Sequence, residues 1–148
     1  MSMTPAKAFV DTNILLRAFV VEMDQHARAE ALLREYWQQG TELWISGQVI
    51  REYLVQITHP KTFKEPLPID TVIESIKRIT PLFQIADDTP AVRNELLELL
   101  KKYPTRGKQI HDANIVAAML AHGIEVLLTL NVEDMKRFSD RITLITLD

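Results

Sequence analysis

The stretch AFVDTNILLRAF, residues 8–19, decides how this chain is expected to fold. Its first three residues, 8–10, form a continuous apolar run, which is typical of a strand buried on both faces of a sheet. Asp11 ends the run, and apolar residues then return at helical spacing as far as Phe19. A buried strand that passes directly into a helix predicts the first part of a strand–helix–strand unit.

The same alternation of short apolar runs and helical segments continues along the chain. Further strands are expected at residues 42–45, 82–85, 126–129 and 142–146. Helices are expected at residues 13–19, 24–39, 46–57, 71–80, 90–103, 110–122 and 133–138. Strands separated by helices favour a mostly parallel sheet with helices on both faces, and therefore a three-layer α/β/α fold.

Polar residues and glycines set several of the expected helix ends. Asp24, Ser46 and Asn131 are each expected to cap a helix with a side-chain oxygen. Pro90 suits the first helical position, where its missing N–H costs nothing. Gly123 supplies a left-handed stop after the most apolar helix of the chain.

Length and composition indicate a single soluble domain spanning residues 1–148. The chain is 47% hydrophobic and 25% charged, which is ordinary for a globular protein. Its 17 basic and 20 acidic side chains give a formal net charge of −3, which excludes a globally basic nucleic-acid binder but permits a local basic patch. The absence of cysteine excludes disulfides and a thiol nucleophile. No apolar run approaches a membrane span, so we expect a cytoplasmic protein.

Side chains with oxygen ligands follow the ends of several expected strands. Asp11 follows the first strand, and Glu52 lies in the second turn of the helix after the second strand. Asp112 begins the helix that runs back toward the fourth strand, which Asn131 and Asp134 follow. Because functional sites of such sheets gather at the carboxyl ends of the strands, the topology is expected to bring these residues to one rim.

Carboxylates gathered at one rim need a counter-charge, since several cannot stay ionised together within about 4–6 Å. Hard oxygen ligands suit Mg²⁺ or Mn²⁺. Such an ion lowers the pKa of a bound water and clamps a phosphate, which is the chemistry of phosphodiester hydrolysis. Taken singly, Asp11 could be only a helix cap, and Asp112 is favoured by the helix dipole. A functional site is favoured because these residues are expected at the same rim of the sheet.

Missing motifs exclude other classes of site. The chain has neither G-x-G-x-x-G nor a Walker A motif, which argues against dinucleotide and P-loop binding. It lacks the G-x-S-x-G nucleophile elbow of α/β-hydrolases. Asn13 stands where phosphoaspartate phosphatases carry a second aspartate.

Phosphate contacts must come from local bases, because the chain is acidic overall. The basic residues expected near the rim are Arg17, Arg51, Arg106, Lys108, Lys136 and Arg137. Such contacts make affinity for a nucleic acid fall with increasing salt.

Four segments in combination resemble the PIN-domain (PilT N-terminal) nucleases, and more narrowly the VapC-type toxins of prokaryotic toxin–antitoxin pairs. The segments are FVDTNILLR (9–17), SGQVIREYL (46–54), HDANIVAAMLAHG (111–123) and LLTLNVEDMKRF (127–138). They span nearly the whole chain, and their combination is far more specific than any one of them.

The resemblance implies a PIN-like α/β/α nuclease that cuts RNA with Mg²⁺ or Mn²⁺ held by Asp11, Glu52 and Asp112. Many members carry an aspartate where this chain has Asn131, whereas others show the T-x-N-x-x-D form present here at residues 129–134. Both Asn131 and Asp134 therefore remain candidates for the fourth position of the catalytic set.

Substrate and partners follow from the same hypothesis. Thr12, Asn13, Arg106 and Lys108 are expected to contact the RNA substrate. The resemblance also implies a homodimer and a cognate antitoxin protein. Apolar residues in the segments 13–19 and 49–57, unless they fill the core, would form the partner surface.

The expected mechanism is attack by a metal-activated water, which leaves 5′-phosphate and 3′-hydroxyl ends. The other ribonuclease chemistry uses the ribose 2′-hydroxyl with a general base and acid, usually histidines, and leaves a cyclic phosphate. Only His111 lies near the expected rim, so a histidine pair is lacking.

Other functions remain open at this point. PIN domains also process ribosomal RNA precursors and act in RNA decay, so the nuclease need not be a toxin. A catalytically silent PIN fold that binds RNA or protein is an alternative from another class, although the intact acidic set argues against it. A generic α/β phosphate-binding domain is disfavoured by the missing glycine motifs.

Overall fold

The computed structural model describes residues 4–147. A parallel sheet of five strands lies at its centre, in the order β3-β2-β1-β4-β5. The strands are β1 (Lys7–Val10), β2 (Glu42–Ser46), β3 (Gln84–Ala86), β4 (Val126–Leu128) and β5 (Thr143–Ile145). The predicted single domain of residues 1–148 also includes residues 1–3 and 148, which lie outside the described part.

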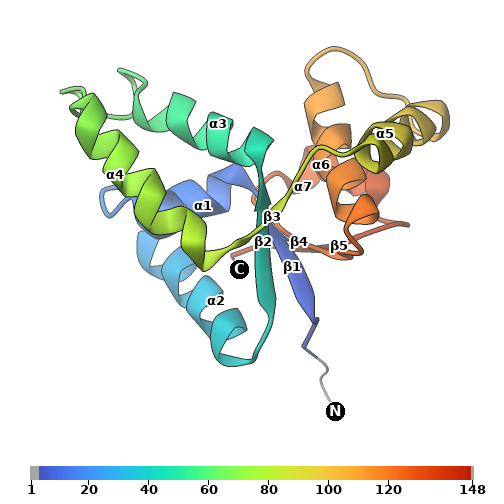
Figure 1. Ribbon diagram of the computed structural model, residues 1–148, viewed down its shortest axis with the longest axis horizontal. Coiled ribbons are helices and arrows are strands. Elements are labelled where there is room, and N and C mark those ends of the chain that lie inside the picture. Colours follow the sequence, from blue (N-terminus) through green and yellow to red (C-terminus); the bar gives the residue numbers. More distant parts are fainter. Residues whose placement is uncertain (1–3, 148) are drawn as a thin grey trace.

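Seven α-helices and two 3₁₀ turns connect these strands in the described part of the chain. The helices are α1 (Thr12–Phe19), α2 (His26–Gln38), α3 (Gly47–Ile57), α4 (Ile69–Ile79), α5 (Pro90–Lys102), α6 (Gln109–Ala121) and α7 (Val132–Met135). The 3₁₀ turns are η1 (Thr80–Leu82) and η2 (Lys136–Phe138). Helices α1–α4 lie on one side of the sheet and α5–α7 on the other, which confirms the predicted three-layer α/β/α fold (Figure 1).

The hydrophobic core lies on both faces of β1, the central strand. Phe9 and Val10 are fully buried, as expected for a parallel strand covered on each side. Ile14 in α1 and Met119 in α6 are also fully buried, so both helical layers contribute to the core. None of the helices in residues 4–147 has both the length and the apolar character of a membrane span.

Most of the apolar residues considered for a partner surface belong to this core. Ile14 and Leu15 of α1 and Tyr53 of α3 are almost completely buried. Val55 is the clear exception, since 59% of its surface is exposed. The core therefore accounts for the apolar character of both helices, and little of it remains for a partner.

Several helix ends follow the predicted capping chemistry. The Ser46 hydroxyl accepts a hydrogen bond from the Val49 amide at 3.3 Å, and Pro90 begins α5. Gly123 adopts a positive φ of 71°, which a left-handed stop requires. Asn131 stands at the start of α7 but makes no side-chain cap hydrogen bond.

Several predicted boundaries differ from those of the structure, and two of the differences have a clear local reason. Asp24 does not cap α2, which begins at His26 after Gln25, a residue with a left-handed φ of 62° and no side-chain cap bond. The third strand begins at Gln84, because Leu82 belongs to η1 and the Phe83 amide donates to the Thr80 carbonyl at 3.1 Å instead of to a neighbouring strand.

The strand order changes direction at β1, which positions the site. β1 pairs with β2 on one side and with β4 on the other. The Asp11 amide donates to the Leu128 carbonyl at 3.0 Å, so the carboxyl ends of β1 and β4 lie side by side. A crevice outside such a switch point is where open α/β sheets bind their ligands.

Candidate active site

A cleft of about 810 Å³ opens at the carboxyl ends of β1 and β4. Its walls come from α1, α3, the start of α6 and the segment after β4. Figure 1 shows α3 and α6 on opposite sides of this edge of the sheet. The predicted site residues that line the cleft are Asp11, Thr12, Asn13, Glu52, Lys108, Asp112 and Asn131.

Asp11 is the most deeply placed acid of the cleft, with only 5% of its surface exposed. It caps α1, and its Oδ1 accepts a hydrogen bond from the Thr12 amide at 2.8 Å. Its Oδ2 accepts from the Thr129 hydroxyl at 2.7 Å. Burial raises the pKa of Asp11, and these hydrogen bonds to the carboxylate oppose the rise. The carboxylate is thus held in one orientation.

Two polar side chains tie the start of α1 to the segment after β4. The Thr129 hydroxyl, which donates to Asp11, also accepts a 2.9 Å hydrogen bond from the Asn131 amide. The Asn13 Oδ1 accepts from the Leu130 amide at 3.0 Å. Because Thr129 is fully buried, its hydrogen bonds are shielded from competing water.

Gln48 holds the second acid, Glu52, and joins the two helical layers. Its Nε2 donates to the Glu52 Oε1 at 2.9 Å and to the His111 carbonyl at 3.0 Å. Its Oε1 accepts from the Asn114 Nδ2 at 3.1 Å. Sequence analysis missed Gln48. Its spacing of four residues from Glu52 on one helix is the signal that could have identified it.

Asp112 lies in the first turn of α6 and is half-buried at the cleft. Its pKa is raised from 3.8 to about 6, first by desolvation. Negative charge raises it further, from Asp134, Asp11 and Glu52 in that order. Arg137 acts in the opposite direction. Acids from four separate segments therefore repel one another across a single site.

Asn131 and Asp134, the two candidates for the fourth position, lie differently. Asn131 lines the cleft. Asp134 is exposed and does not line it, although its charge acts on Asp112 more strongly than that of any other acid. The side-chain amide of Asn131 therefore faces the cleft directly, whereas the Asp134 carboxylate acts on Asp112 from outside the lining.

The predicted metal ligands fit a hard divalent cation in chemistry but do not enclose one. Asp11, Glu52 and Asp112 offer carboxylate oxygens to one cleft, which is the donor type that Mg²⁺ and Mn²⁺ prefer. Within residues 4–147, however, no three acidic or histidine side chains form a group that could hold a metal ion.

Three of the predicted basic residues line the cleft: Arg17, Arg51 and Lys108. Arg106 lies outside the lining, and its backbone amide donates to the Gln109 Oε1 at 3.1 Å. Its predicted contact with substrate therefore stays a prediction. Positive charge reaches the cleft chiefly from α1 and α3 rather than from the loop before α6.

The remaining two basic residues make contacts within the protein. Lys136 forms an exposed ion pair with Glu133 at 2.7 Å. The Arg137 Nη1 donates to the Pro104 carbonyl at 2.8 Å, which joins the loop before α6 to the segment after α7. Arg137 thus contributes positive charge beside Asp112 without lining the cleft.

Solved structures of similar fold extend over most of this chain. VapBC2 from Rickettsia felis, bound to a promoter DNA fragment, has a TM-score of 0.66 at 19% identity, covering 96% of this chain and 99% of that one. A toxin–antitoxin complex from Klebsiella pneumoniae has a TM-score of 0.64 at 22% identity, covering 95% and 98%. VapC20 from Mycobacterium tuberculosis, a sarcin–ricin loop cleaving toxin, has a TM-score of 0.59 at 19% identity, covering 81% and 86%.

Sequence comparison identifies the family. The PIN-domain model matches residues 8–140, which contain every predicted acid of the site. No curated protein matches the sequence. The similar structures share the fold at low identity, and the family model extends over most of the chain. On this evidence, the chain belongs to the PIN-domain family.

Proposed function

We propose that this chain is a metal-dependent endoribonuclease that acts as the toxin of a toxin–antitoxin pair. One observation carries the proposal. Three carboxyl groups from separate segments, those of Asp11, Glu52 and Asp112, face one cleft, where burial and the charges of the neighbouring acids raise the pKa of Asp112. Carboxylates grouped in this way favour an anionic phosphodiester only when a cation lies between them and the phosphate.

Asp11, Glu52 and Asp112 would hold Mg²⁺ or Mn²⁺, and Asn131 or Asp134 would complete the set. When bound, the ion offsets the negative charge of the cleft and favours ionisation of water for attack on a phosphodiester. The chemistry leaves 5′-phosphate and 3′-hydroxyl ends. The cleft contains one histidine, His111, so the paired-histidine route to a cyclic phosphate lacks its second group.

Residues of the chain supply orientation and substrate contacts. The Thr12 amide and the Thr129 hydroxyl fix the Asp11 carboxylate. Gln48 orients Glu52, and a carboxylate of this set would accept the proton of the attacking water. The phosphates on either side of the scissile bond would contact the cationic side chains of the cleft, those of Arg17, Arg51 and Lys108.

The proposed toxin role rests on what two of the similar structures are. VapC20 is described as a toxin that cleaves the sarcin–ricin loop, and the Klebsiella pneumoniae structure is a toxin–antitoxin complex. By analogy, the partners would be an RNA substrate, a cognate antitoxin and a second copy of the chain, in the cytoplasm. Light scattering at tens of micromolar is expected to show a dimer, and a monomer alone would contradict that part of the proposal.

Cleavage of labelled RNA tests the nuclease. We expect cleavage that requires Mg²⁺ or Mn²⁺, that stops in excess EDTA, and that is lost in Asp11→Asn. Asp88→Asn is the matched control, because Asp88 is exposed and lies outside the cleft. Full activity in EDTA, or 2′,3′-cyclic phosphate products, would refute the mechanism. Undiminished cleavage by Asp11→Asn would refute the assignment of the site.

Expression in cells tests the toxin role separately. We expect that expression of the chain arrests growth, that Asp11→Asn does not, and that a small neighbouring gene encoding a DNA-binding antitoxin relieves the arrest. A chain that cleaves RNA but does not impair growth would support a nuclease of RNA processing instead.

A further inference from the structure

A second depression, of about 460 Å³, adjoins the active-site cleft. We name it the side groove; it is lined by Leu16, Met23, Gln56, His59, Lys61 and Thr62. Leu16, Met23 and Gln56 also line the cleft, so the two hollows are continuous. The path therefore leads from the buried Asp11 along α3 to the loop that follows this helix.

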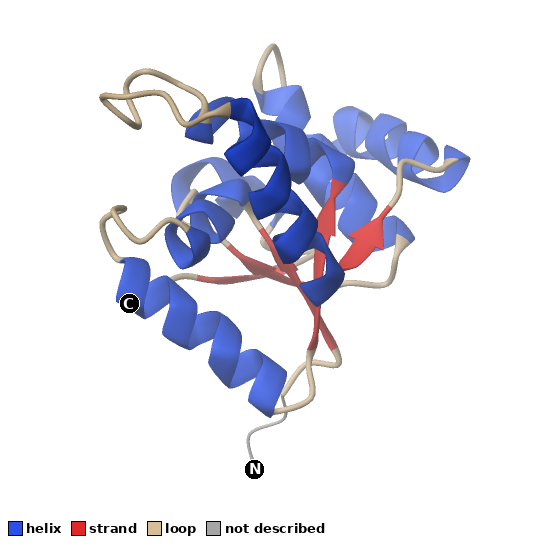
Figure 2. Ribbon diagram, turned by 60° about the vertical axis from the view of Figure 1, so that its left-hand side comes forward, coloured by secondary structure: helices blue, strands red, loops and turns tan. Residues whose placement is uncertain are grey.

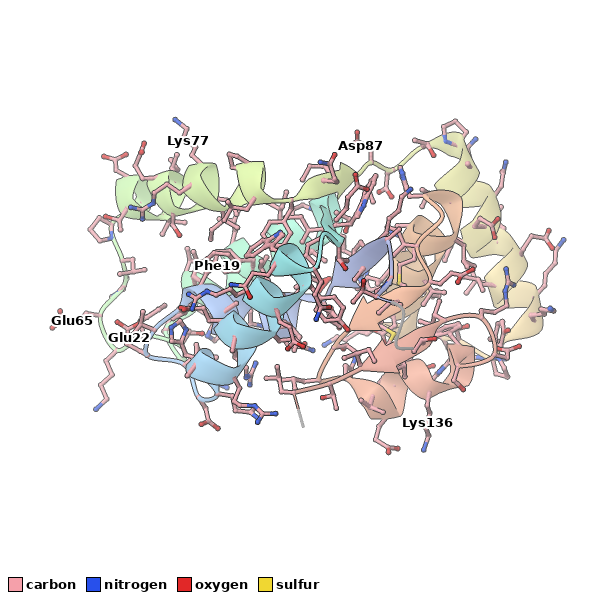
Figure 3. The ribbon with its side chains drawn as sticks, turned by 90° about the horizontal axis from the view of Figure 1, so that it is seen from below. Phe19, Glu22, Glu65, Lys77, Asp87 and Lys136 are labelled. Atoms are coloured by element: carbon pink, nitrogen blue, oxygen red, sulfur yellow. The ribbon has the colours of Figure 1, made fainter. Side chains whose placement is uncertain are left out.

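Two loops far apart in the sequence form the outer end of this path. One joins α1 to α2 and the other joins α3 to α4, and Figure 2 shows both on the same side of the molecule. Figure 3 shows Glu22 and Glu65, one from each loop, at the same end. Neither glutamate lines the side groove.

Compared with the cleft, which is lined by three carboxylates and three cationic side chains, the side groove differs in charge. Its lining contains Lys61 and His59 and no carboxylate. Among the ion pairs within residues 4–147, none involves Lys61. The phosphates of a strand that extends beyond Gln56 would therefore meet a cation, Lys61, with no carboxylate in the same lining.

His59 is arranged as a hydrogen-bond donor. The Lys61 backbone amide donates to the His59 Nδ1 at 3.1 Å, so this nitrogen carries a lone pair. The proton of the ring is then on Nε2, which is a donor and suits a phosphate or ribose oxygen. The backbone of the loop thus determines that Nε2 is the ring nitrogen able to donate a hydrogen bond to a ligand.

The junction between cleft and groove suits a nucleobase. Leu16 and Met23 provide apolar contact there, and Gln56 is an exposed amide that can both donate and accept hydrogen bonds. Glu52 and Gln56 are four residues apart on α3, a rise of about 6 Å along the helix axis. A base beside the scissile phosphate would therefore reach Gln56 while its backbone continues toward Lys61.

We infer that the side groove binds the nucleotides next to the scissile bond of a single-stranded RNA, with Lys61 and His59 on its backbone and Gln56 on a base. The inference rests on the proposed function and extends it to the part of the substrate that lies outside the cleft. A single strand fits because Asp11 is only 5% exposed. The scissile phosphate must enter the cleft to approach it, and a flexible strand can follow such a path.

Binding of a fluorescent single-stranded RNA oligonucleotide to the full chain tests the groove. Anisotropy is measured in EDTA over a series of salt concentrations, so that the readout does not depend on cleavage. We expect Lys61→Ala to weaken binding and to reduce the slope of log affinity against log salt by about 0.7, the contribution of one phosphate contact on a single strand. Lys64→Ala is the matched control, since Lys64 belongs to the same loop but does not line the groove.

Substrate length provides a second measurement. We expect Lys61→Ala to raise KM for the oligonucleotide while KM for a dinucleotide and kcat stay unchanged. Equal effects of Lys61→Ala and Lys64→Ala, or no effect of either on RNA binding, would overturn the inference. So would a Lys61→Ala variant that binds RNA normally but loses a protein partner, because the groove would then be a protein-docking surface. If the wild-type chain binds RNA and Lys61→Ala weakens that binding, but no cleavage is found, only the proposed nuclease activity would be contradicted.

Discussion

The Thr129 hydroxyl donates a 2.7 Å hydrogen bond to the Asp11 Oδ2, although the two residues are 118 positions apart in the sequence. Asp11 follows β1 and Thr129 follows β4, so this bond joins the two strand ends that flank the cleft. Since Thr129 is fully buried, water cannot replace its hydroxyl when the side chain is changed.

Thr129→Val removes this hydroxyl while nearly preserving the shape of the side chain. We expect the free energy of unfolding to fall by about 1–3 kcal/mol, because the Asp11 Oδ2 and the backbone N–H of Asn131 both lose a buried hydrogen-bond partner. Cleavage of RNA should fall as well, since Asp11 loses its orientation. Urea denaturation and cleavage assays measure the two effects, and Thr129→Ser should restore most of both. A Thr129→Val variant as active as the wild type would show that Asp11 needs no such support.

Gln48→Ala removes the side chain that joins α3 to α6. The Glu52 carboxylate, the His111 carbonyl and the Asn114 amide each lose a hydrogen bond, so we expect unfolding to become easier by about 1–3 kcal/mol. Cleavage should fall because Glu52 is no longer held. Gln56→Ala on the same helix serves as a stability control, as Gln56 is exposed and its side chain spans no helices. Equal stability of the two variants would contradict the role given to Gln48.

The metal-free protein should lose stability as pH rises in the acidic range. The pKa of Asp112 is raised from 3.8 to about 6 in the folded state, so the folded protein binds more protons than the unfolded chain between these values. The free energy of unfolding therefore falls as pH rises from about 4 to about 6. Burial of Asp11 raises its pKa and adds to the same trend. Thermal unfolding in EDTA at several pH values measures it.

Asp112→Asn should remove much of this pH dependence and should stabilise the metal-free protein at neutral pH. The reason is that an amide carries no charge to be repelled by Asp134, Asp11 and Glu52. Saturating Mg²⁺ is expected to reduce the pH dependence of wild-type stability, because a bound cation offsets the repulsion among these carboxylates. A melting temperature that changes with pH equally in the wild type and in Asp112→Asn, from pH 4 to pH 6 in EDTA, would show that the raised pKa of Asp112 does not contribute to stability.

Calorimetry of Mn²⁺ binding tests the ligand assignment without reference to activity. Asp112→Ala and Asp11→Ala are each expected to weaken binding by at least tenfold, because each removes a carboxylate oxygen from a small set of hard ligands. Asp88→Ala, which changes an exposed acid outside the cleft, should bind as the wild type does. Unchanged binding in Asp112→Ala would make the assignment wrong.

Local sequence determined the framework of this protein. The apolar run before Asp11 predicts β1, and the periodicity of the later segments predicts the helices, because buried strands and amphipathic helices have distinct repeats. Alternation of strands and helices then predicts the parallel sheet, and the rule for carboxyl ends predicts that Asp11, Glu52 and Asp112 share a rim. They line one cleft in the structure.

Tertiary structure decided which side chains from distant segments support these acids and which predicted residues lie outside the site. Nothing local indicates that Thr129 supports Asp11, that Gln48 joins α3 to α6, or that Arg106 stays out of the cleft. The continuity of the cleft with the groove at Lys61 depends on two loops that meet only after folding. The physical reason is that repeats and caps reflect interactions within a few residues, whereas a side-chain contact depends on the packing and register of elements distant in the sequence.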